Sequence, residues 1–517
     1  MKKLVISILV LFALLSMQTQ AQDTIMVIAD PHVLPQTEIA QETNFENYMA
    51  KQRKMVDLSE PIWKALMDTA MKYKPSLVLI PGDLTRDGEP AAHDTVSATL
   101  ERLQQAGIRT LVIPGNHDLP ATVAWENLYS GTFENAVKDP NSFSYAVEPL
   151  PGVTVIGIDG SNGNAGTGVL KPGTLQFVLA QADSAVAKGH MIIAMSHWQI
   201  LEHFDKKSTL ESSCRFKNAD ALRDSLMTHG VHLVLTGHFH VNSISTWHDE
   251  IHLTDSIVEI STGSPITFPC PYRWLTISED RAMVDVATEY ITALDTIADL
   301  YTYSRAWMAE HTYNLIPSLA PRMWNKVDEY KSKIVNDYGS MVKAMCLYFG
   351  DLGAEIDNAI PSTDSARVDL VQRHIGKAVV DLYLFHSEAN ENERPALADS
   401  LTQAVYDGMQ NMMIEVVTPS EVLSCMADLL LPMAQLMAEG PVQSLAEDIT
   451  QRNDVNENRT DDLHPTLVIN APLHQDLNNP TIISDSQLHA ADKFLHDGRL
   501  YIRHDDRIYN TYGQQVQ

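Results

Sequence analysis

Six short apolar runs in this chain of 517 residues each end in a polar residue that can bind a metal ion, and this repetition limits the possible folds more than any other feature. Short apolar runs bounded by Gly and Pro are typical of β-strands that are buried on both faces of a sheet. Ligands in such sheets bind beyond the carboxyl ends of the strands, so we expect the six polar ends to meet at one rim. The runs are residues 24–29, 76–80, 109–113, 153–158, 191–195 and 233–236.

The polar ends follow a particular order of residue types. Taken singly they have ordinary explanations, because Gly-Asp after a strand is usually a turn and a lone His is usually on the surface or satisfied in the core. In chain order the blocks are Asp-Pro-His at 30–32, Gly-Asp at 82–83, Gly-Asn-His-Asp at 115–118, His197 and Gly-His-Phe-His at 237–240. Together they resemble the ordered motif set of the calcineurin-like metallophosphoesterases over roughly residues 22–290. Asp159, which follows the run 153–158, has no counterpart in that set.

The resemblance implies a fold class and a dinuclear metal site. The fold would be α/β, with a two-sheet sandwich flanked by helices. Carboxylate and amide oxygens combined with imidazoles suit two divalent metal ions such as Mn, Fe or Zn. The implied ligands are Asp30, His32, Asp83 and His240 for the first ion, and Asp83, Asn116, His197 and His238 for the second, so that Asp83 is the bridge.

The resemblance also implies roles for residues beside the ligands. Two ions about 3.5–4 Å apart can clamp the attacking and leaving oxygens of a phosphoryl transfer and make a hydroxide nucleophile from bound water. His117, next to the ligand Asn116, matches the family's general acid. Asp87 is expected to orient the His117 ring, with Asp118 as the competing partner. Arg86 and Asp118 are candidate substrate-binding residues, although an Arg in a loop is more often solvated.

The stretches 82–88 and 115–118 most resemble the cyclic-nucleotide phosphodiesterase branch of this family. We therefore predict an exported dinuclear-metal phosphoesterase that hydrolyses small phosphodiesters, with cyclic nucleotides among the candidates. A phosphomonoesterase is the nearest alternative, and a non-catalytic envelope binding protein is an alternative of another class. Trp198 and Phe239, each beside a ligand His, could present a stacking face for a base, although such aromatic neighbours usually serve packing.

The N-terminal residues predict export. Lys2 and Lys3, the apolar stretch 4–15 and the small residue Ala21 form the three zones of a signal peptide over residues 1–21. The apolar stretch is too short for a transmembrane anchor, and no later stretch is long and apolar enough. We expect a periplasmic or secreted protein. A formal net charge of −29 repels polyanions, which disfavours long nucleic acid and leaves a small phosphoester as the substrate.

The organisation changes after the predicted catalytic domain, residues 22–290. Apolar residues spaced by three and four in 368–382 indicate an amphipathic helix, and we expect a helical domain, an all-α bundle, over 291–455. Its Met-rich stripes are a possible partner surface, although Met at helical spacing is more often core filler. Residues 456–517 are predicted to be a linker and a C-terminal tail that contains a short β-hairpin. The tail resembles those of exported bacterial proteins, which makes cell-surface association an alternative.

The cysteines leave two interpretations open. They lack the Cys-x-x-Cys spacing of thiolate metal sites. An oxidising compartment would allow Cys214 to pair with Cys270, and Cys346 with Cys425. Four buried thiols are equally compatible with the sequence.

Overall fold

The computed structural model describes the chain from residue 22 to residue 510, with gaps within that range at 120–123, 164–165, 204–213, 249–255, 334, 337–338, 390–393, 421–422, 424, 426–463, 470–491, 497–498 and 505–506. The expected signal peptide, residues 1–21, lies outside the described residues. None of the helices among the described residues combines the length and the apolar character that spanning a bilayer requires.

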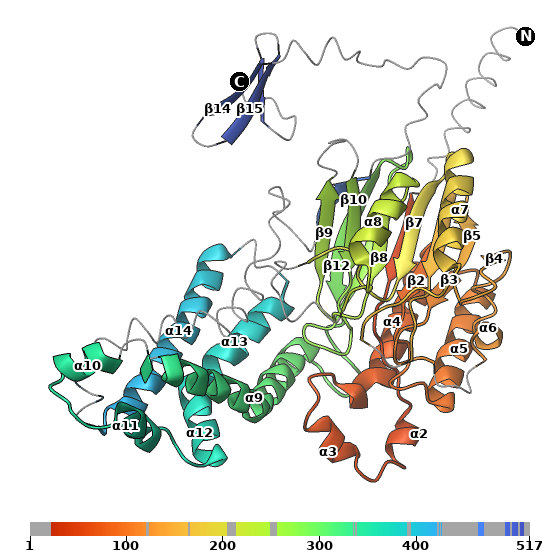
Figure 1. Cartoon of the computed structure of the whole chain (residues 1–517). Helices are drawn as coiled ribbons and strands as arrows, with labels where there is room; N and C mark the ends of the chain where they lie inside the picture. The colour runs from red at the N-terminus through yellow and green to blue at the C-terminus, as the bar shows by residue number, and fades with distance from the viewer. Residues whose placement is uncertain are drawn as a thin grey trace, which may run out of the picture.

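Two sheets form the centre of the N-terminal part of the chain (Figure 1). In spatial order the first sheet contains β13 (Thr466–Val468), β12 (Met283–Tyr290), β11 (Pro271–Ile277), β1 (Asp23–Val27), β2 (Leu77–Pro81) and β3 (Arg109–Ile113). The second contains β4 (Val137–Lys138), β5 (Tyr145–Leu150), β6 (Val153–Ile158), β7 (Met191–Ser196), β8 (Leu233–Thr236), β10 (Ser256–Ser261) and β9 (Ser243–His248). The α/β class and the two-sheet sandwich are as predicted.

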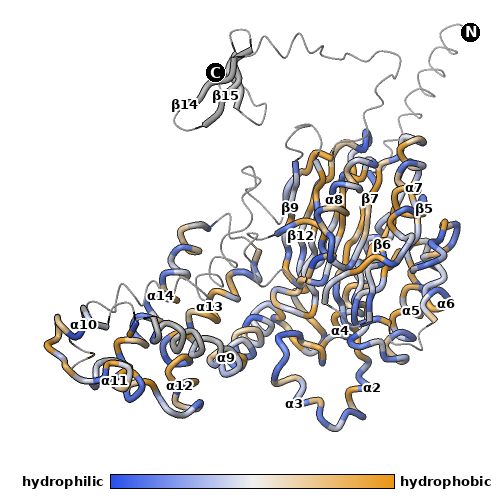
Figure 2. The backbone as a smooth tube through the Cα atoms, in the orientation of Figure 1, coloured by the Kyte–Doolittle hydropathy of each residue, from blue (hydrophilic) through white to orange (hydrophobic). Residues whose placement is uncertain are grey.

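The six predicted strands form two parallel triplets. Strands β1, β2 and β3 run parallel in the first sheet, and β6, β7 and β8 run parallel in the second. Each strand is buried on both faces, which explains the unbroken apolar runs: in β7, Ile193 and Met195 pack between the sheets, while Ile192 and Ala194 pack under the outer helices. Figure 2 shows the hydrophobic residues along these strands.

Helices cover both outer faces of the sandwich. The first sheet packs against α4 (Ser59–Tyr73) and α5 (Pro90–Gln105), and the second packs against α7 (Thr174–Ala187) and α8 (Ala219–Thr228). Each helix carries a stripe of buried residues on one face, as an amphipathic surface helix must. The shorter helical segments are α2 (Gln36–Ile39), α3 (Phe45–Met49), the 3₁₀ turn Val56–Leu58 and α6 (Trp125–Leu128).

A helical region follows the sandwich, as predicted. Its helices are α9 (Leu300–Lys333), α10 (Gly339–Met345), α11 (Leu352–Ala359), α12 (Asp364–His374), α13 (Gly376–Ser387) and α14 (Pro395–Val417). The apolar stripe over 368–382 is divided between α12 and α13 rather than lying on one helix. Gly376 is the first residue of the second helix, and a Cβ there would lie 2.8 Å from the Tyr313 ring. Close packing therefore requires glycine at this position, and glycine also disfavours a helix that continues through it. Met412 is buried in the shared core, which supports core filling by methionine.

A disulfide and a small C-terminal sheet lie beyond residue 345. Cys346 and Cys425 form a disulfide, whereas Cys214 and Cys270 remain thiols. The expected tail hairpin is present as β15 (Arg499–His504) and β16 (Arg507–Asn510), which are extended by β14 (Asp492–His496) into a three-stranded sheet.

The stretch predicted to be a linker contributes to the sandwich, which corrects that prediction. Strand β13 pairs antiparallel with β12, and Ile469 just beyond it is buried between the two sheets. The signal was weak because the strand is three residues long and Val468 within it is 65% exposed.

We predict that Ile469→Ala lowers the free energy of unfolding by about 2–4 kcal/mol, because it leaves a cavity between the sheets. Val468→Ala is the matched control, and it should change that free energy by less than about 0.5 kcal/mol. Denaturant unfolding of both variants would measure this. Equal effects would show that residue 469 is not held in the core.

Candidate metal centre

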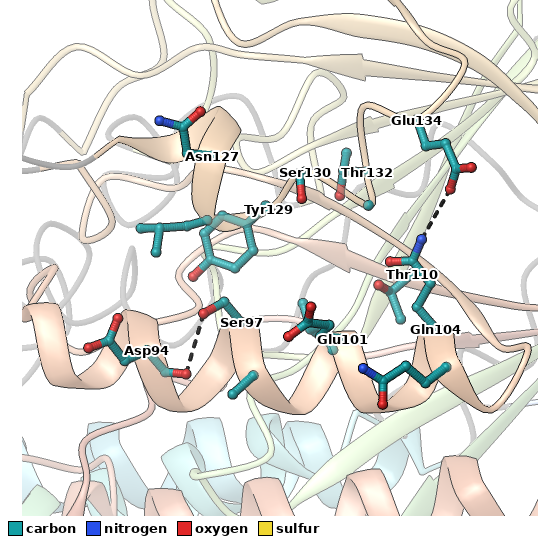
Figure 3. Close-up of a pocket in the computed structure, with 15 residues that line it drawn as sticks. Asp94, Ser97, Glu101, Gln104, Thr110, Asn127, Tyr129, Ser130, Thr132 and Glu134 are labelled. Carbon is teal, nitrogen blue, oxygen red and sulfur yellow. Dashed lines mark hydrogen bonds between the residues drawn. The ribbon is translucent and has the colours of Figure 1, made fainter.

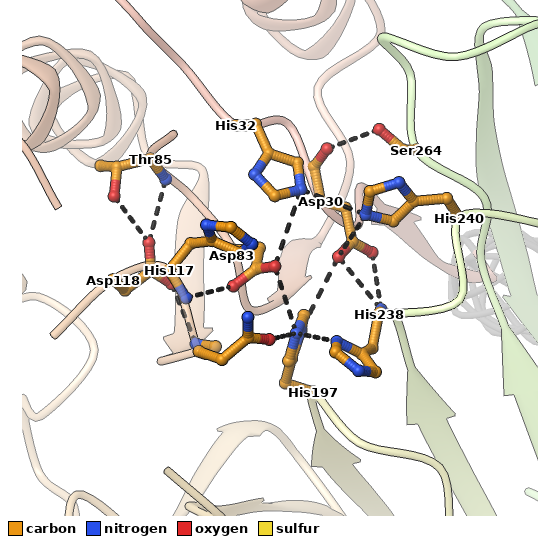
Figure 4. Close-up of polar contacts among 12 residues, drawn as sticks. Asp30, His32, Asp83, Thr85, His117, Asp118, His197, His238, His240 and Ser264 are labelled. Carbon is orange, nitrogen blue, oxygen red and sulfur yellow. Dashed lines mark hydrogen bonds and ion pairs between the residues drawn. The ribbon is translucent and has the colours of Figure 1, made fainter. Parts of the chain in front are cut away.

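The motif residues of both sheets meet where the carboxyl ends of their parallel strands face each other (Figure 4). Asp30 and His32 follow β1, Asp83 follows β2, Asn116 follows β3, His197 follows β7, and His238 and His240 follow β8. Five of the six polar strand ends therefore converge as expected. Asp159 is the exception: its carboxylate accepts hydrogen bonds from the backbone N–H groups of Phe143 and Ser161, at 3.0 and 2.8 Å, and serves the local loop.

The backbone at this rim is strained. Left-handed φ angles are uncommon for residues with a side chain, and such strain is concentrated at functional sites. Five of the seven predicted ligands have them: Asp30 (51°), His32 (41°), Asp83 (49°), His238 (67°) and His240 (62°). Sharp turns directly after the strands thus aim these side chains at one another.

Two motif glycines leave space for ligands that come from other strands. A Cβ at Gly115 would lie 2.1 Å from Asp83 Oδ1, and one at Gly237 would lie 2.4 Å from Asp30 Oδ2. Both positions therefore require glycine for close approach rather than for a turn. The glycines in Gly-Asn-His-Asp and Gly-His-Phe-His follow from this crowding.

The first group of ligating atoms is Asp30, His32, Asp83 and His240. His32 Nε2 lies 3.6 Å from Asp83 Oδ2, and His240 Nε2 lies 3.4 Å from Asp30 Oδ1. The Nε2 atoms of His32 and His240 are 3.1 Å apart. Asp30 is fixed in place because its carboxylate accepts the His238 backbone N–H, at 2.9–3.0 Å.

The second group contains Asp83, His197 and His238, with the amide of Asn116 beside them. His197 Nε2 lies 3.3 Å from Asp83 Oδ2, 3.1 Å from Asn116 Oδ1 and 2.9 Å from His238 Nδ1. Asp83 belongs to both groups, as expected of a bridging carboxylate. In each group the candidate atoms from His, Asp and Glu lie within 4.8 Å of one another.

The donor and acceptor pattern of these groups fits bound cations. His197 Nδ1 faces the Pro81 carbonyl at 3.0 Å and donates to it, which leaves the lone pair of Nε2 facing the oxygens of Asp83 and Asn116 in the neutral ring. A cation at this point would turn the repulsion between lone pairs into attraction. Without metal, a proton has the same effect: burial opposes it, but the Asp83 and Asp30 carboxylates raise the pKa of His197 to about 9. The site therefore fits a pair of divalent ions.

His117 and Asp87 make the predicted contact. His117 Nδ1 lies 2.7 Å from Asp87 Oδ1, and the His117 backbone N–H donates to Asp83 Oδ1 at 2.9 Å. Burial disfavours the charged ring, but the hydrogen bond to Asp87 and the charge of Asp83 outweigh it and raise the pKa of His117. Because Nδ1 faces Asp87, Nε2 is the ring nitrogen that is chemically available for proton transfer.

Asp118 has neither of the two roles considered for it. It is fully buried, and its carboxylate accepts hydrogen bonds from the N–H groups of Leu84, Thr85 and Gly115 at 2.9–3.1 Å. It therefore ties the loops after β2 and β3 together. Its carboxylate is neither the His117 partner nor placed to meet a substrate.

Arg86 is engaged in ion pairs with other parts of the fold. Its guanidinium bonds to Glu42 at 2.5 Å and to Glu89 at 2.7 Å, and it lies 5.4 Å from the centre of the Tyr48 ring. These partners neutralise its charge. The geometry therefore assigns Arg86 to holding the 36–49 segment rather than to binding phosphate.

Two residues near the site, Lys54 and Glu259, lie outside the sequence motifs. Lys54 lies close enough to the centre for Asp83 and Asp30 to act on its pKa, which burial nevertheless lowers. Glu259, on β10, is fully buried and accepts the N–H groups of Ile200 and Leu201 at 2.8 and 2.7 Å. It also accepts the Thr236 hydroxyl at 2.8 Å. Glu259 thus fixes the chain just after His197 and just before His238.

A large cavity lies away from the predicted metal ligands (Figure 3). It measures about 840 Å³ and is bounded by α5 and the 127–134 segment. Its lining includes Asp94, Glu101 and Glu134 and no basic residue. The negative charge makes it unsuitable for an anionic substrate.

Solved structures with a resembling region include three hydrolases. A dimetal phosphatase from Danio rerio is 16% identical, with 51% of this chain and 95% of that chain covered at a TM-score of 0.40. A purple acid phosphatase from yellow lupin (Lupinus luteus) seeds is 13% identical, with 52% of each chain covered and a TM-score of 0.36. A phosphopantetheinyl hydrolase from Mycobacterium tuberculosis is 13% identical, with 47% of this chain and 91% of that chain covered and a TM-score of 0.24.

No curated protein matches the chain at a significant level. The calcineurin-like phosphoesterase family matches residues 24–242, a range that contains the whole of both ligand groups. Over residues 24–242, the chain is thus similar to the calcineurin-like phosphoesterases.

Proposed function

We propose that this protein is an exported phosphodiesterase that hydrolyses small phosphodiesters at a dinuclear metal centre, with His117 as the general acid. The observation that carries the proposal is the arrangement of Asp83, which belongs to both ligand groups and also accepts the His117 backbone N–H at 2.9 Å. This places a proton donor, fixed by Asp87, at the edge of the metal centre.

The chain's own residues have distinct tasks in this proposal. Two divalent ions, Mn, Fe or Zn, would supply Lewis-acid chemistry and water of lowered pKa. Asp83 holds the two ligand groups together, and Asp30 positions His238 through its backbone. His117 protonates the leaving oxygen from Nε2, because Asp87 fixes its other nitrogen. Lys54 adds positive charge close to the carboxylates.

The His117–Asp87 pair supports hydrolysis of an alkyl phosphoester. The leaving group of such an ester is a basic alkoxide unless it is protonated, so a positioned acid is useful for alkyl diesters and alkyl monoesters alike. A phosphomonoesterase remains the competing function. A non-catalytic envelope protein is disfavoured because all seven predicted ligand side chains are present and directed to one place.

The proposal of export to a periplasmic, secreted or surface location has one further support. The Cys346–Cys425 disulfide closes a loop across the helical region, and disulfides persist mainly in oxidising compartments. Together with the signal-like residues 1–21, it favours a protein that acts outside the cytoplasm.

We predict that Asp83→Asn lowers both bound metal and turnover of bis-(p-nitrophenyl) phosphate. The loss in turnover should be orders of magnitude, well beyond the roughly 10- to 100-fold that follows loss of a residue that only supports a ligand. Elemental analysis and initial rates would measure the two effects. Full activity in this variant, or in wild type verified to be free of metal, would refute the dinuclear assignment.

The general-acid role predicts a dependence on the leaving group. Nitrophenolate departs without protonation, whereas an alkoxide needs it, and general acids contribute about 10²- to 10⁴-fold. His117→Ala should therefore lose far more rate with a cyclic or alkyl phosphodiester than with bis-(p-nitrophenyl) phosphate, at unchanged metal content.

A matched control is His229→Ala. His229 forms a similar pair with Asp183 on the surface, with 2.6 Å between Nδ1 and Oδ1, and its removal should leave both rates unchanged. Equal losses with both substrates in His117→Ala would instead assign His117 to supporting the metals. A wild-type preference for alkyl monoesters over every diester would favour the phosphomonoesterase function.

A further inference from the structure

A cavity of about 410 Å³ lies beside His238 and His240, between the sandwich and the helical region. On the sandwich side its wall includes the segment 51–54 and Phe239. On the other side, α9 contributes Met308 and Leu315, and α13 contributes Tyr383 and His386. The helical region thus forms one wall of a cavity that starts at the predicted metal ligands.

Direct contacts hold this wall in place. The Arg53 guanidinium lies 4.8 Å from the centre of the Tyr383 ring, and the Phe239 and His386 rings are 5.8 Å apart, edge to face. Below them, Phe268 of the sandwich packs with Met308, Val380 and Leu384 of the helices in one buried apolar cluster. A buried cluster of this kind fixes α13 against the catalytic domain, so the cavity is part of the folded protein.

The charge of the cavity is opposite to that of the chain. The full sequence carries 66 acidic and 37 basic residues, yet the described lining contains Lys51, Arg53 and Lys54 and no Asp or Glu. The larger cavity beside α5 shows the reverse, with acidic residues and no basic one. Basic side chains grouped in a concave, partly apolar surface attract anions much more strongly than scattered surface charges do.

The lining also provides aromatic surface. Phe239, Tyr383 and His386 present rings, and Met308 and Leu315 add apolar surface. A volume of about 410 Å³ falls within the range that accommodates a small organic ligand. Rings beside cations suit a planar group that is linked to a negative charge.

We propose that this cavity binds the part of the substrate attached to the hydrolysed phosphate, and that this part carries a planar ring and a second anionic group. The inference rests on the proposed phosphodiesterase function, and it names the substrate class for that site. In this assignment the centre between the sheets performs the chemistry, whereas segment 51–54 and helix α13 select the substrate.

The test compares two substrates that differ only in the second charge. They are the 5′-(p-nitrophenyl phosphate) ester of thymidine and the same ester with a 3′-phosphate. Wild-type protein loaded with metal should show a kcat/KM roughly tenfold or more higher for the ester with the 3′-phosphate, as expected for charge-assisted hydrogen bonds. High salt should reduce this preference, because the Lys51 side chain is exposed to solvent and salt therefore screens its charge.

Variants locate the effect. Lys51→Ala and Arg53→Ala, singly and combined, should bring the ratio of the two kcat/KM values towards one by lowering kcat/KM for the ester with the 3′-phosphate more than for the ester without it. Lys377→Ala is the matched control: it removes a cation from α13 whose side chain is 87% exposed and outside the cavity, so it should keep the wild-type ratio. Measurable turnover of bis-(p-nitrophenyl) phosphate by each variant shows that it is folded.

The outcomes separate the two levels of the proposal. No hydrolysis of any diester by metal-loaded wild type would refute the phosphodiesterase function itself. Hydrolysis of both thymidine esters with equal kcat/KM would leave that function standing and refute the assignment of the cavity. A preference that persists in the combined Lys51→Ala and Arg53→Ala variant would also overturn the assignment of the cavity, because the 3′-phosphate would then be bound by other residues.

Discussion

One carboxylate, that of Asp83, connects the two halves of the site. Its Oδ2 lies 3.6 Å from His32 Nε2 on the first sheet and 3.3 Å from His197 Nε2 on the second, while Oδ1 accepts the His117 N–H. Burial alone would raise the pKa of this carboxyl, but the charge of His197 and its hydrogen bond to Asp83 lower it well below its usual value. The anionic form is thus maintained in a dry environment by groups from both sheets.

The packing of the rest of the sandwich stabilises the strained backbone at the ligands. Left-handed conformations at residues with side chains cost about 1–3 kcal/mol each, and they persist only where the surroundings determine them. Continuous apolar packing between the sheets and under the helices provides that support. Buried polar groups also tie these segments together: Asp118 joins the loops after β2 and β3, and Glu259 joins the loop after β7 to the end of β8.

The parts of the fold that the sequence predicted are those with a local and repeated signal. Strands buried on both faces produce unbroken apolar runs, and the ligands follow at fixed offsets, so both could be read without tertiary information. The partner of His117 was ambiguous because Asp118 is its neighbour in sequence whereas Asp87 is 30 residues away, and only the fold shows that backbone N–H groups already occupy Asp118.

Other features depend on contacts that no local pattern encodes. Glu259 is an isolated acid in an apolar strand, and its function follows from contacts with residues 23 to 59 positions away in sequence. Strand β13 is too short to give a periodic signal, and the break at Gly376 reflects packing against Tyr313. Lys51, Arg53 and Lys54 resemble an ordinary solvated basic stretch until α13 is placed opposite them.

The position of α13 has a consequence for how substrate preference can change. The predicted ligands lie in sharp turns directly after the strands, so substitutions there would displace the ligand atoms. The opposite wall of the cavity lies on α13, which packs into the helical core around Val379 and Leu382 and reaches Phe268 of the sandwich through Val380 and Leu384. On its cavity face, Tyr383 contacts Arg53 and His386 contacts Phe239, and neither residue is a predicted metal ligand. In the proposed assignment, substitutions at Tyr383 or His386 would alter the shape and charge of the cavity without replacing a metal ligand, so that substrate selection and reaction would depend on separate parts of the chain.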